Sequence, residues 1–243
     1  MSGIDRRSFL KFASGAALAT GGAGYLAEAL AQGKITPGPK DVFIVVDVQK
    51  CFIPGGSLAV EKGDEIVPLI NAIAKKFENV VMTQDWHTAD HVSFASQHEG
   101  KKPFETVQLA YGTQVLWPDH CVQGTEGAEF APGLDIPHAT LVIRKGYHRD
   151  VDSYSTFLEA DKKTPTGLTG YLKARGIKRA YLAGLATDFC VGWSAIDARA
   201  AGFKAAVIED ACRGINLGGT GLEAAWKEMV AKGVARIQST DLA

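Results

Sequence analysis

The stretch Val42-Phe-Ile-Val-Val46 is entirely apolar and is followed directly by an aspartate. A short run of this kind, rich in β-branched residues, is typical of a strand that is buried on both faces of a parallel sheet. Five similar runs follow along the chain, at residues 80–82, 140–143, 180–183, 205–208 and 234–237. These runs predict a sheet of six parallel strands.

Helical patterns lie between several of these runs, at residues 65–77, 167–175, 189–201 and 219–232. Strands that alternate with helices imply right-handed crossovers, which place helices on both faces of the sheet. We therefore expect an α/β fold, a Rossmann-like three-layer sandwich. Residues 86–137 break the alternation and are rich in His, Trp, Gly and Pro. A long irregular insert in a compact domain is usually functional.

The composition indicates one globular domain or at most two small ones, because 46% of the 243 residues are hydrophobic. The 26 basic and 27 acidic residues leave a net charge of -1, without the basic excess that nucleic-acid binding requires. Four cysteines are too few for a disulfide scaffold in a chain of this length. We interpret one of them as a nucleophile and the other three as structural thiols.

The first 31 residues have the pattern of a signal peptide. Asp5-Arg-Arg-Ser-Phe-Leu-Lys11 precedes a weakly hydrophobic, Gly- and Ala-rich stretch that ends in small residues at Ala31. The paired arginines resemble the twin-arginine export signal, and the apolar stretch is too short for a spanning helix. We expect the twin-arginine translocase to export the folded chain. Residues 32–243 would then be a soluble periplasmic domain without a membrane anchor.

Reactive side chains follow the predicted strands at their carboxyl ends, where ligands bind to an open parallel sheet. Asp47, Asp85, Lys145 and Cys190 occupy these positions. Cys190 lies near the start of a helix, whose partial positive charge favours a thiolate. Lys145 would stabilise that thiolate, and Asp47 would accept the thiol proton. The alternative for Cys190 is an ordinary buried core residue, which is our interpretation of Cys212. The alternative for Lys145 is a side chain that reaches the solvent.

The irregular insert contains candidate metal ligands. Asp85 and His87 are two residues apart, so both side chains point to the same side of an extended segment. His91 and His120 follow, and imidazole with carboxylate suits zinc, iron or manganese at a catalytic site. We interpret Cys121 as structural, with a ligand role as the alternative. We interpret the remaining histidines as surface or loop residues: His98, His138 and His148.

Together the motifs resemble the nicotinamidase/pyrazinamidase group of the isochorismatase-like cysteine hydrolases, over about residues 41–238. The segments that carry the resemblance are Val46-Asp-Val-Gln49 with Phe52 and Gly55-Gly-Ser-Leu58, Thr83-Gln-Asp-Trp-His87 with His91, Trp117-Pro-Asp-His-Cys-Val-Gln-Gly-Thr125, and Gly184-Leu-Ala-Thr-Asp-Phe-Cys-Val191. The resemblance implies hydrolysis of nicotinamide, and of pyrazinamide, to the acid and ammonia through a thioester, as in pyridine nucleotide salvage.

The resemblance also implies roles for individual residues. The catalytic triad would be Asp47, Lys145 and Cys190. One divalent ion, zinc first and iron or manganese as alternatives, would be held in the loop 85–125. Its ligands would be Asp85, His87 and His120, with His91 as a fourth ligand in some members.

The resemblance further implies a cis peptide between Leu185 and Ala186, and an oxyanion hole formed by the N–H groups of Ala186 and Cys190. Four residues would surround the pyridine ring: Phe52, Leu58, Trp117 and Tyr154. An apolar and aromatic wall suits a flat heteroaromatic amide.

Other functions remain as alternatives. One is a different amide or carbamoyl hydrolase of the same superfamily, and another is the metal-free isochorismatase branch, which lacks the nucleophilic cysteine. A non-catalytic exported protein that binds pyridines or metal ions is a third. The sequence leaves the oligomeric state open, a homo-oligomer included.

Overall fold

The computed structural model describes residues 33–243. Six parallel strands form one sheet in the order β5-β2-β1-β6-β7-β8, which confirms the predicted fold. The strands are β1 (Asp41–Val46), β2 (Asn79–Asp85), β5 (Leu141–Lys145), β6 (Arg179–Leu185), β7 (Lys204–Arg213) and β8 (Ala235–Ile237). The expected signal peptide at residues 1–31 lies outside the described residues.

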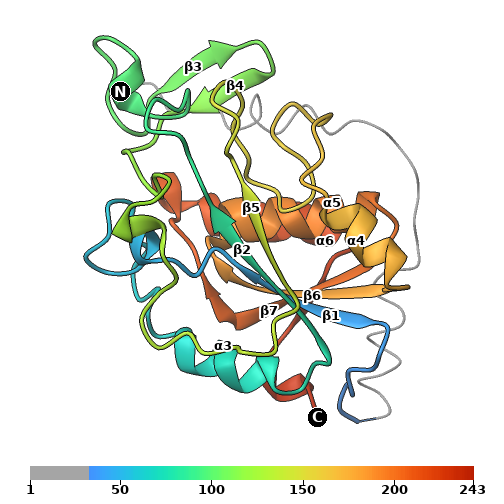
Figure 1. The fold of residues 1–243 in the computed structure, drawn as a ribbon. Coiled ribbons are helices and arrows are strands. Elements are labelled where there is room, and N and C mark those ends of the chain that lie inside the picture. The colour runs from blue at the N-terminus through green and yellow to red at the C-terminus, as the bar shows by residue number, and fades with distance from the viewer. Residues whose placement is uncertain (1–32) are drawn as a thin grey trace.

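Four α-helices of the described residues cover the sheet: α3 (Val67–Ala74), α4 (Leu168–Ala174), α5 (Gly192–Ala200) and α6 (Gly221–Ala231). Helix α3 lies on one face, and α4, α5 and α6 lie together on the other, so the domain has three layers (Figure 1). A π-helical turn at Thr187–Val191 leads into α5. Within residues 33–243, no helix is long and apolar enough to cross a membrane.

Strand β1, which contains the apolar run Val42–Val46, lies at the centre of the core. Every residue of β1 is buried, because the strand lies between β2 and β6 and has helices over both faces. The ring of Phe43 stacks on Phe77 with centroids 5.4 Å apart, and Phe77 in turn contacts Tyr181. Full burial of one such side chain contributes on the order of 1.5–3 kcal/mol.

The insert at residues 86–137 contains an antiparallel hairpin that the sequence pattern does not predict. Strands β3 (Thr106–Leu109) and β4 (Gly112–Val115) pair only with each other. The hairpin lies beyond the carboxyl ends of β2 and β5 (Figure 1). Single-turn helices complete the described part of the chain: η2 (Lys50–Phe52), η3 (Ala95–Gln97), η4 (Glu126–Ala128), η6 (Leu217–Gly219) and η7 (Ser239–Asp241).

Two of the expected structural thiols are joined to each other. Cys51 and Cys121 form a disulfide with Cα atoms 5.7 Å apart, which lies within the range that a disulfide spans. Their separation of 70 residues hides the pairing from any local pattern. Cys190 and Cys212 are free and buried.

Candidate active site

The register of the sheet brings the reactive side chains together. Asp85, the last residue of β2, is directly paired with Lys145, the last residue of β5. Asp47 follows β1, whose last residue pairs with Gly184 of β6. Cys190 lies in the π-helical turn that follows β6. Side chains from four neighbouring strands of the sheet, β5, β2, β1 and β6, therefore meet at one edge.

The ammonium group of Lys145 lies at the centre of this cluster. Its Nζ atom is 2.9 Å from Asp47 Oδ2 and 2.5 Å from Asp85 Oδ1, and it donates to the Ser153 carbonyl at 2.8 Å. Cys190 Sγ lies 3.5 Å from the same atom. The side chain has no solvent exposure, which excludes a lysine that reaches the solvent. Burial alone would lower the pKa of Lys145, but the attraction of the two carboxylates outweighs it and raises the pKa well above its usual value.

Asp47 and Cys190 form the second part of the cluster. Burial raises the pKa of Asp47, although Lys145 opposes the effect. Thr83 holds the carboxylate through a 2.5 Å hydrogen bond from its hydroxyl to Asp47 Oδ1. A buried carboxyl with a raised pKa has the basicity that a general base requires.

The surroundings of Cys190 oppose the expected resting thiolate. Burial raises the pKa of Cys190 well above its usual value, and Asp47 and Asp85 raise it further, while Lys145 acts in the opposite direction. The physical reason is that two carboxylates already neutralise the single lysine charge. This environment favours the thiol form of Cys190, whose proton would pass to a neighbouring base before the sulfur attacks.

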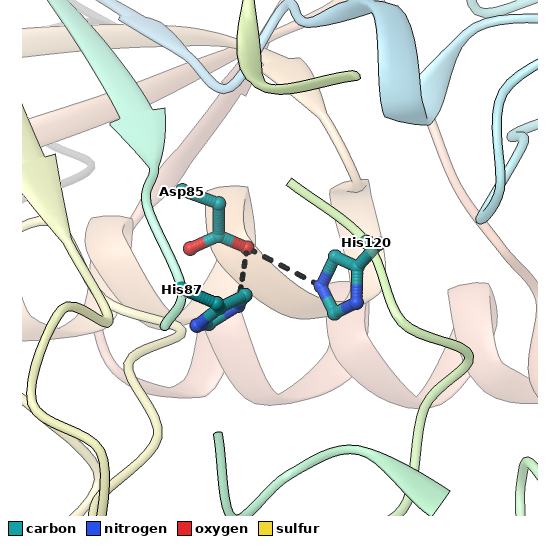
Figure 2. Close-up of side chains that lie close together, drawn as sticks. All are labelled: Asp85, His87 and His120. Carbon is teal, nitrogen blue, oxygen red and sulfur yellow. Dashed lines mark ion pairs between the residues drawn. The ribbon is translucent and has the colours of Figure 1, made fainter. Parts of the chain in front are cut away.

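Asp85, His87 and His120 converge on one point (Figure 2). The Nε2 atoms of His87 and His120 lie 3.4 Å and 3.6 Å from Asp85 Oδ2. Each Nδ1 atom is 2.8 Å from a backbone carbonyl, of Gly146 for His87 and of Pro118 for His120. These carbonyls hold Nδ1 as the protonated nitrogen, which leaves Nε2 of each ring as the atom that would bind a metal.

This donor set fits a divalent metal ion. Zinc ligands about 2.0–2.2 Å from the ion in a tetrahedral arrangement lie roughly 3.4 Å from one another, close to the observed separations. Carbonyls that hold the second ring nitrogen are the usual outer support of metal-bound histidines. All three side chains are buried.

Gly146 gives His87 its carbonyl partner and the space for its ring. The glycine has a φ of +67°, and a Cβ atom there would lie 2.5 Å from His87 Cε1. Any larger residue would push the imidazole away from Asp85. Gln49 supports the other side, because its side chain exchanges hydrogen bonds with the backbone N–H and C=O of Asp85.

His91 lies beside the three ligands but faces another way. Its ring stacks near His87 with centroids 4.2 Å apart. Its Nδ1 atom is 2.7 Å from Ser93 Oγ, and its Nε2 atom is 3.2 Å from the Val151 carbonyl. Burial and the charge of His87 lower the pKa of His91 to about 4, so the ring is neutral. His91 could therefore serve as a fourth metal ligand through Nε2 only if its hydrogen bond to the Val151 carbonyl were broken.

The residues expected around the substrate ring are all buried: Phe52, Leu58, Trp117 and Tyr154. Phe52 lies near the metal-ligand candidates, with its ring centroid 5.5 Å from that of His120. Trp117 Nε1 donates to the Tyr154 hydroxyl at 3.0 Å. Phe189, to which the sequence assigns no role, packs on both rings with centroids at 4.8 and 5.6 Å.

Several supporting residues carry no recognisable signal in the sequence. Gln114 of β4 donates to Asp152 Oδ2 at 2.7 Å and to the Tyr154 hydroxyl at 3.0 Å. The hairpin therefore holds the aromatic wall directly. Thr83 alone has a usable signal, because it stands two residues before Asp85 on the same strand and so shares its face.

The remaining predictions concern local geometry. The peptide between Leu185 and Ala186 is cis, as predicted. Three histidines lie apart from the site and bond elsewhere: His98 to the Val92 carbonyl, His138 to the Ala74 carbonyl and His148 to Glu159.

A six-stranded parallel sheet that carries a buried thiol beside an aspartate and a lysine at its carboxyl edge defines a hydrolase with a cysteine nucleophile on a Rossmann-like α/β fold. Residues 41–241 match the isochorismatase domain family. The chain is 59% identical to a nicotinamidase of Acinetobacter baylyi over 199 residues, which cover 82% of this chain and 92% of that protein.

Solved structures agree. A nicotinamidase/pyrazinamidase of Acinetobacter baumannii is 61% identical with a TM-score of 0.84, over 85% of this chain and 99% of that one. A pyrazinamidase of Pyrococcus horikoshii in complex with zinc is 35% identical with a TM-score of 0.67, over 82% of this chain and 99% of that one. The chain belongs to the isochorismatase family, within its nicotinamidase/pyrazinamidase group.

Proposed function

We propose that this protein is a nicotinamidase, which hydrolyses nicotinamide to nicotinate and ammonia, and that pyrazinamide is a second substrate. The observation that carries the proposal is the buried cluster in which Lys145 Nζ lies within 3.5 Å of Asp47, Asp85 and Cys190. The 59% identity to a nicotinamidase over most of the chain supports the choice of substrate.

The reaction would begin at the Cys190 thiol. Asp47 takes the thiol proton, and the sulfur attacks the carboxamide carbon while the carbonyl electrons move to oxygen. When the carbonyl re-forms, the C–N bond breaks, Asp47 gives its proton to the nitrogen, and ammonia leaves a thioester. Water then attacks the thioester carbon, Asp47 moves the water proton to sulfur, and nicotinic acid is released. Lys145 holds Asp47 in place through their 2.9 Å ion pair.

Three further assignments belong to this proposal. Asp85, His87 and His120 would hold one divalent ion, with zinc the first choice because a pyrazinamidase relative has been solved with zinc. The ion would supply Lewis-acid attraction for a lone pair of the substrate or of water. The N–H groups of Ala186 and Cys190 would stabilise the oxyanion, and the aromatic wall would hold the pyridine ring.

The decisive experiment is ammonia release from nicotinamide, pyrazinamide and carbamoyl compounds by the zinc-loaded enzyme. We expect turnover of the first two, and Cys190→Ala should lower kcat at least about a thousandfold, as removal of a nucleophile does. Mass spectrometry of wild-type enzyme quenched during turnover should show the nicotinoyl adduct on the peptide that contains Cys190.

Each alternative has its own outcome in the same assay. Turnover of carbamoyl compounds alone would indicate a different amide hydrolase of the superfamily. Binding of nicotinamide without ammonia release would indicate a binding protein. Normal turnover by Cys190→Ala would end the assignment of the nucleophile.

The export of the enzyme is a separate part of the proposal. Residues 1–31 would be a twin-arginine signal peptide, and the hydrolase domain at 32–243 would be released into the periplasm. Two observations support this assignment: the family match begins at residue 41, after the leader, and the chain carries the Cys51–Cys121 disulfide. Disulfides persist in oxidising compartments and are rare in the cytosol.

Cell fractionation with N-terminal sequencing tests the export. We expect a cleaved protein in the periplasm, and retention in the cytoplasm when Arg6→Lys and Arg7→Lys are combined. Uncleaved wild-type protein in the cytoplasm would contradict the export and would leave the catalytic proposal intact.

A further inference from the structure

The Cys51–Cys121 disulfide joins the two halves of the candidate site. Cys51 directly precedes Phe52, and Cys121 directly follows His120. Both cysteines are 1% exposed, so the bridge lies inside the protein. It closes a covalent loop across 70 residues of sequence, and that loop contains all the candidate metal ligands.

On one side, Cys121 contacts the backbone of the ligand loop. Its carbonyl accepts the N–H of His87 at 3.1 Å, and the residue itself has a φ of +45°. Two residues later, Gln123 N donates to the carbonyl of His87 at 2.8 Å. The segment that carries His120 is thus bonded to the segment that carries His87, and Cys121 is the residue at which they meet.

On the other side, Cys51 holds the substrate wall. Its carbonyl accepts the N–H of Leu58 at 3.0 Å. Gly56 packs so closely over the backbone of Cys51 that a Cβ atom would lie 2.4 Å from the same carbonyl. The ring of Phe52, the next residue, lies 5.5 Å from the ring of His120. The position of Cys51 therefore fixes both Phe52 and Leu58.

We propose that Cys51 and Cys121 are positioning residues, and that their disulfide is a redox latch which retains the metal and fixes the substrate wall. The inference rests on the proposed metal site and substrate. With the bridge closed, His120 cannot move away from Asp85 without moving η2, which is held by Lys50 through bonds to Glu126 and Glu129. With the bridge open, these two segments lose their covalent link and keep the ring contact between Phe52 and His120.

The chemistry of the latch is a two-electron exchange. The disulfide forms when one cysteine thiolate attacks a disulfide oxidant and the second thiolate then attacks the cysteine sulfur of the resulting mixed disulfide. The two cysteines together lose two protons and two electrons, and the oxidant becomes two thiols. To open the disulfide, a phosphine reductant attacks one sulfur. The S–S bond breaks, and water converts the phosphonium to a phosphine oxide as both sulfurs gain protons.

The experiment compares zinc release from the oxidised and reduced forms of the mature, zinc-loaded enzyme. Reductant is removed by desalting without oxygen, and thiols are counted in denaturant. We expect two thiols in the oxidised form, Cys190 and Cys212, and four in the reduced form. A chromogenic chelator in excess should withdraw zinc at least about tenfold faster from the reduced form, since loss of outer support around metal ligands costs 10–100-fold in affinity. At saturating zinc, KM for nicotinamide should rise severalfold while kcat changes less than about twofold.

Two variants make the comparison specific. The double variant Cys51→Ala with Cys121→Ala should release zinc at the fast rate whether or not it has met reductant. The matched control is Cys212→Ala, which removes a buried free cysteine of β7 and should keep the full response to reductant. Wild-type protein that carries four thiols when isolated from the periplasm would overturn the proposal.

Equal rates of zinc release from the oxidised and reduced forms would also overturn the proposal. This holds even if reduction lowers the melting temperature, because the disulfide would then be only a structural crosslink. The proposal would also be overturned if neither the oxidised nor the reduced enzyme bound zinc. A failure of the proposed function is distinguishable, because zinc release is measured without substrate.

Discussion

Replacement of Lys145 by methionine tests whether the buried charge cluster holds the site together. The substitution keeps the length of the side chain and removes the ammonium group that contacts both Asp47 and Asp85. Removal of one partner from a buried ion pair costs about 3–5 kcal/mol, because the remaining charge has no compensation. We expect Lys145→Met to lower the free energy of unfolding of the metal-free protein by that amount at pH 7.

The loss should depend on pH in a defined direction. Burial disfavours the charge on Asp85, but Lys145 and His87 outweigh it and hold its pKa well below the ordinary value of 3.8. A carboxyl with a depressed pKa contributes stability above its unfolded pKa, and the contribution disappears as the pH falls through the folded pKa. The difference between wild type and Lys145→Met should therefore be large at neutral pH and should narrow as the pH falls below the unfolded pKa toward the depressed folded pKa of Asp85.

Urea denaturation of the metal-free proteins between pH 3 and pH 8 measures the difference. Lys227→Met, at an exposed position on α6, is the matched control and should change stability by less than about 0.5 kcal/mol. Adding Asp47→Asn to Lys145→Met removes one uncompensated carboxylate and should restore part of the stability. A loss below about 1 kcal/mol that does not vary with pH would refute the reasoning.

Two further predictions concern the support of single ligands. Gly146→Ala should lower zinc affinity 10–100-fold in a chelator competition, because the new Cβ displaces the His87 ring; Gly202→Ala, also at positive φ but with open space, should not. Thr83→Val removes a hydrogen bond that lowers the pKa of Asp47. The acid limb of the kcat/KM profile should move about one pH unit higher, as expected for a charge-assisted bond, and Thr83→Ser should keep it in place.

The sequence pattern predicts the sheet because most of its strands are short, continuous apolar runs, which are typical of a buried parallel sheet. It does not predict the β3–β4 hairpin. Each of these strands has four residues, and β3 is mostly half-buried, so neither has the strong apolar face that a pattern detects. Helix α3 begins at Val67, two residues later than predicted, where Pro68 occupies the first turn.

The residues of the candidate site likewise include some that the sequence pattern predicts and some that it does not. Asp47, Lys145 and Cys190 could be selected because each follows a strand, and all such ends meet at one edge of a parallel sheet. Gln114 and the pairing of Cys51 with Cys121 could not, since these contacts join segments that are distant in sequence. The protonation of Cys190 also escapes the sequence, because it depends on how many carboxylates share one lysine.

Asp85 connects the two halves of the chemistry, because its two oxygens face different partners. Oδ1 lies 2.5 Å from Lys145 Nζ, and Oδ2 faces His87 and His120. A divalent ion held by Asp85, His87 and His120 would draw negative charge away from Oδ1 and would weaken the hold of Asp85 on the lysine. The ammonium would then pair more strongly with Asp47, which lies 2.9 Å away, and that pairing lowers the pKa of Asp47. Metal occupancy should therefore influence the basicity of Asp47, the group that must deprotonate Cys190. Because Asp85 contacts both the metal ligands and Lys145, it couples the metal site to the catalytic cluster in a way that two separate carboxylates would not.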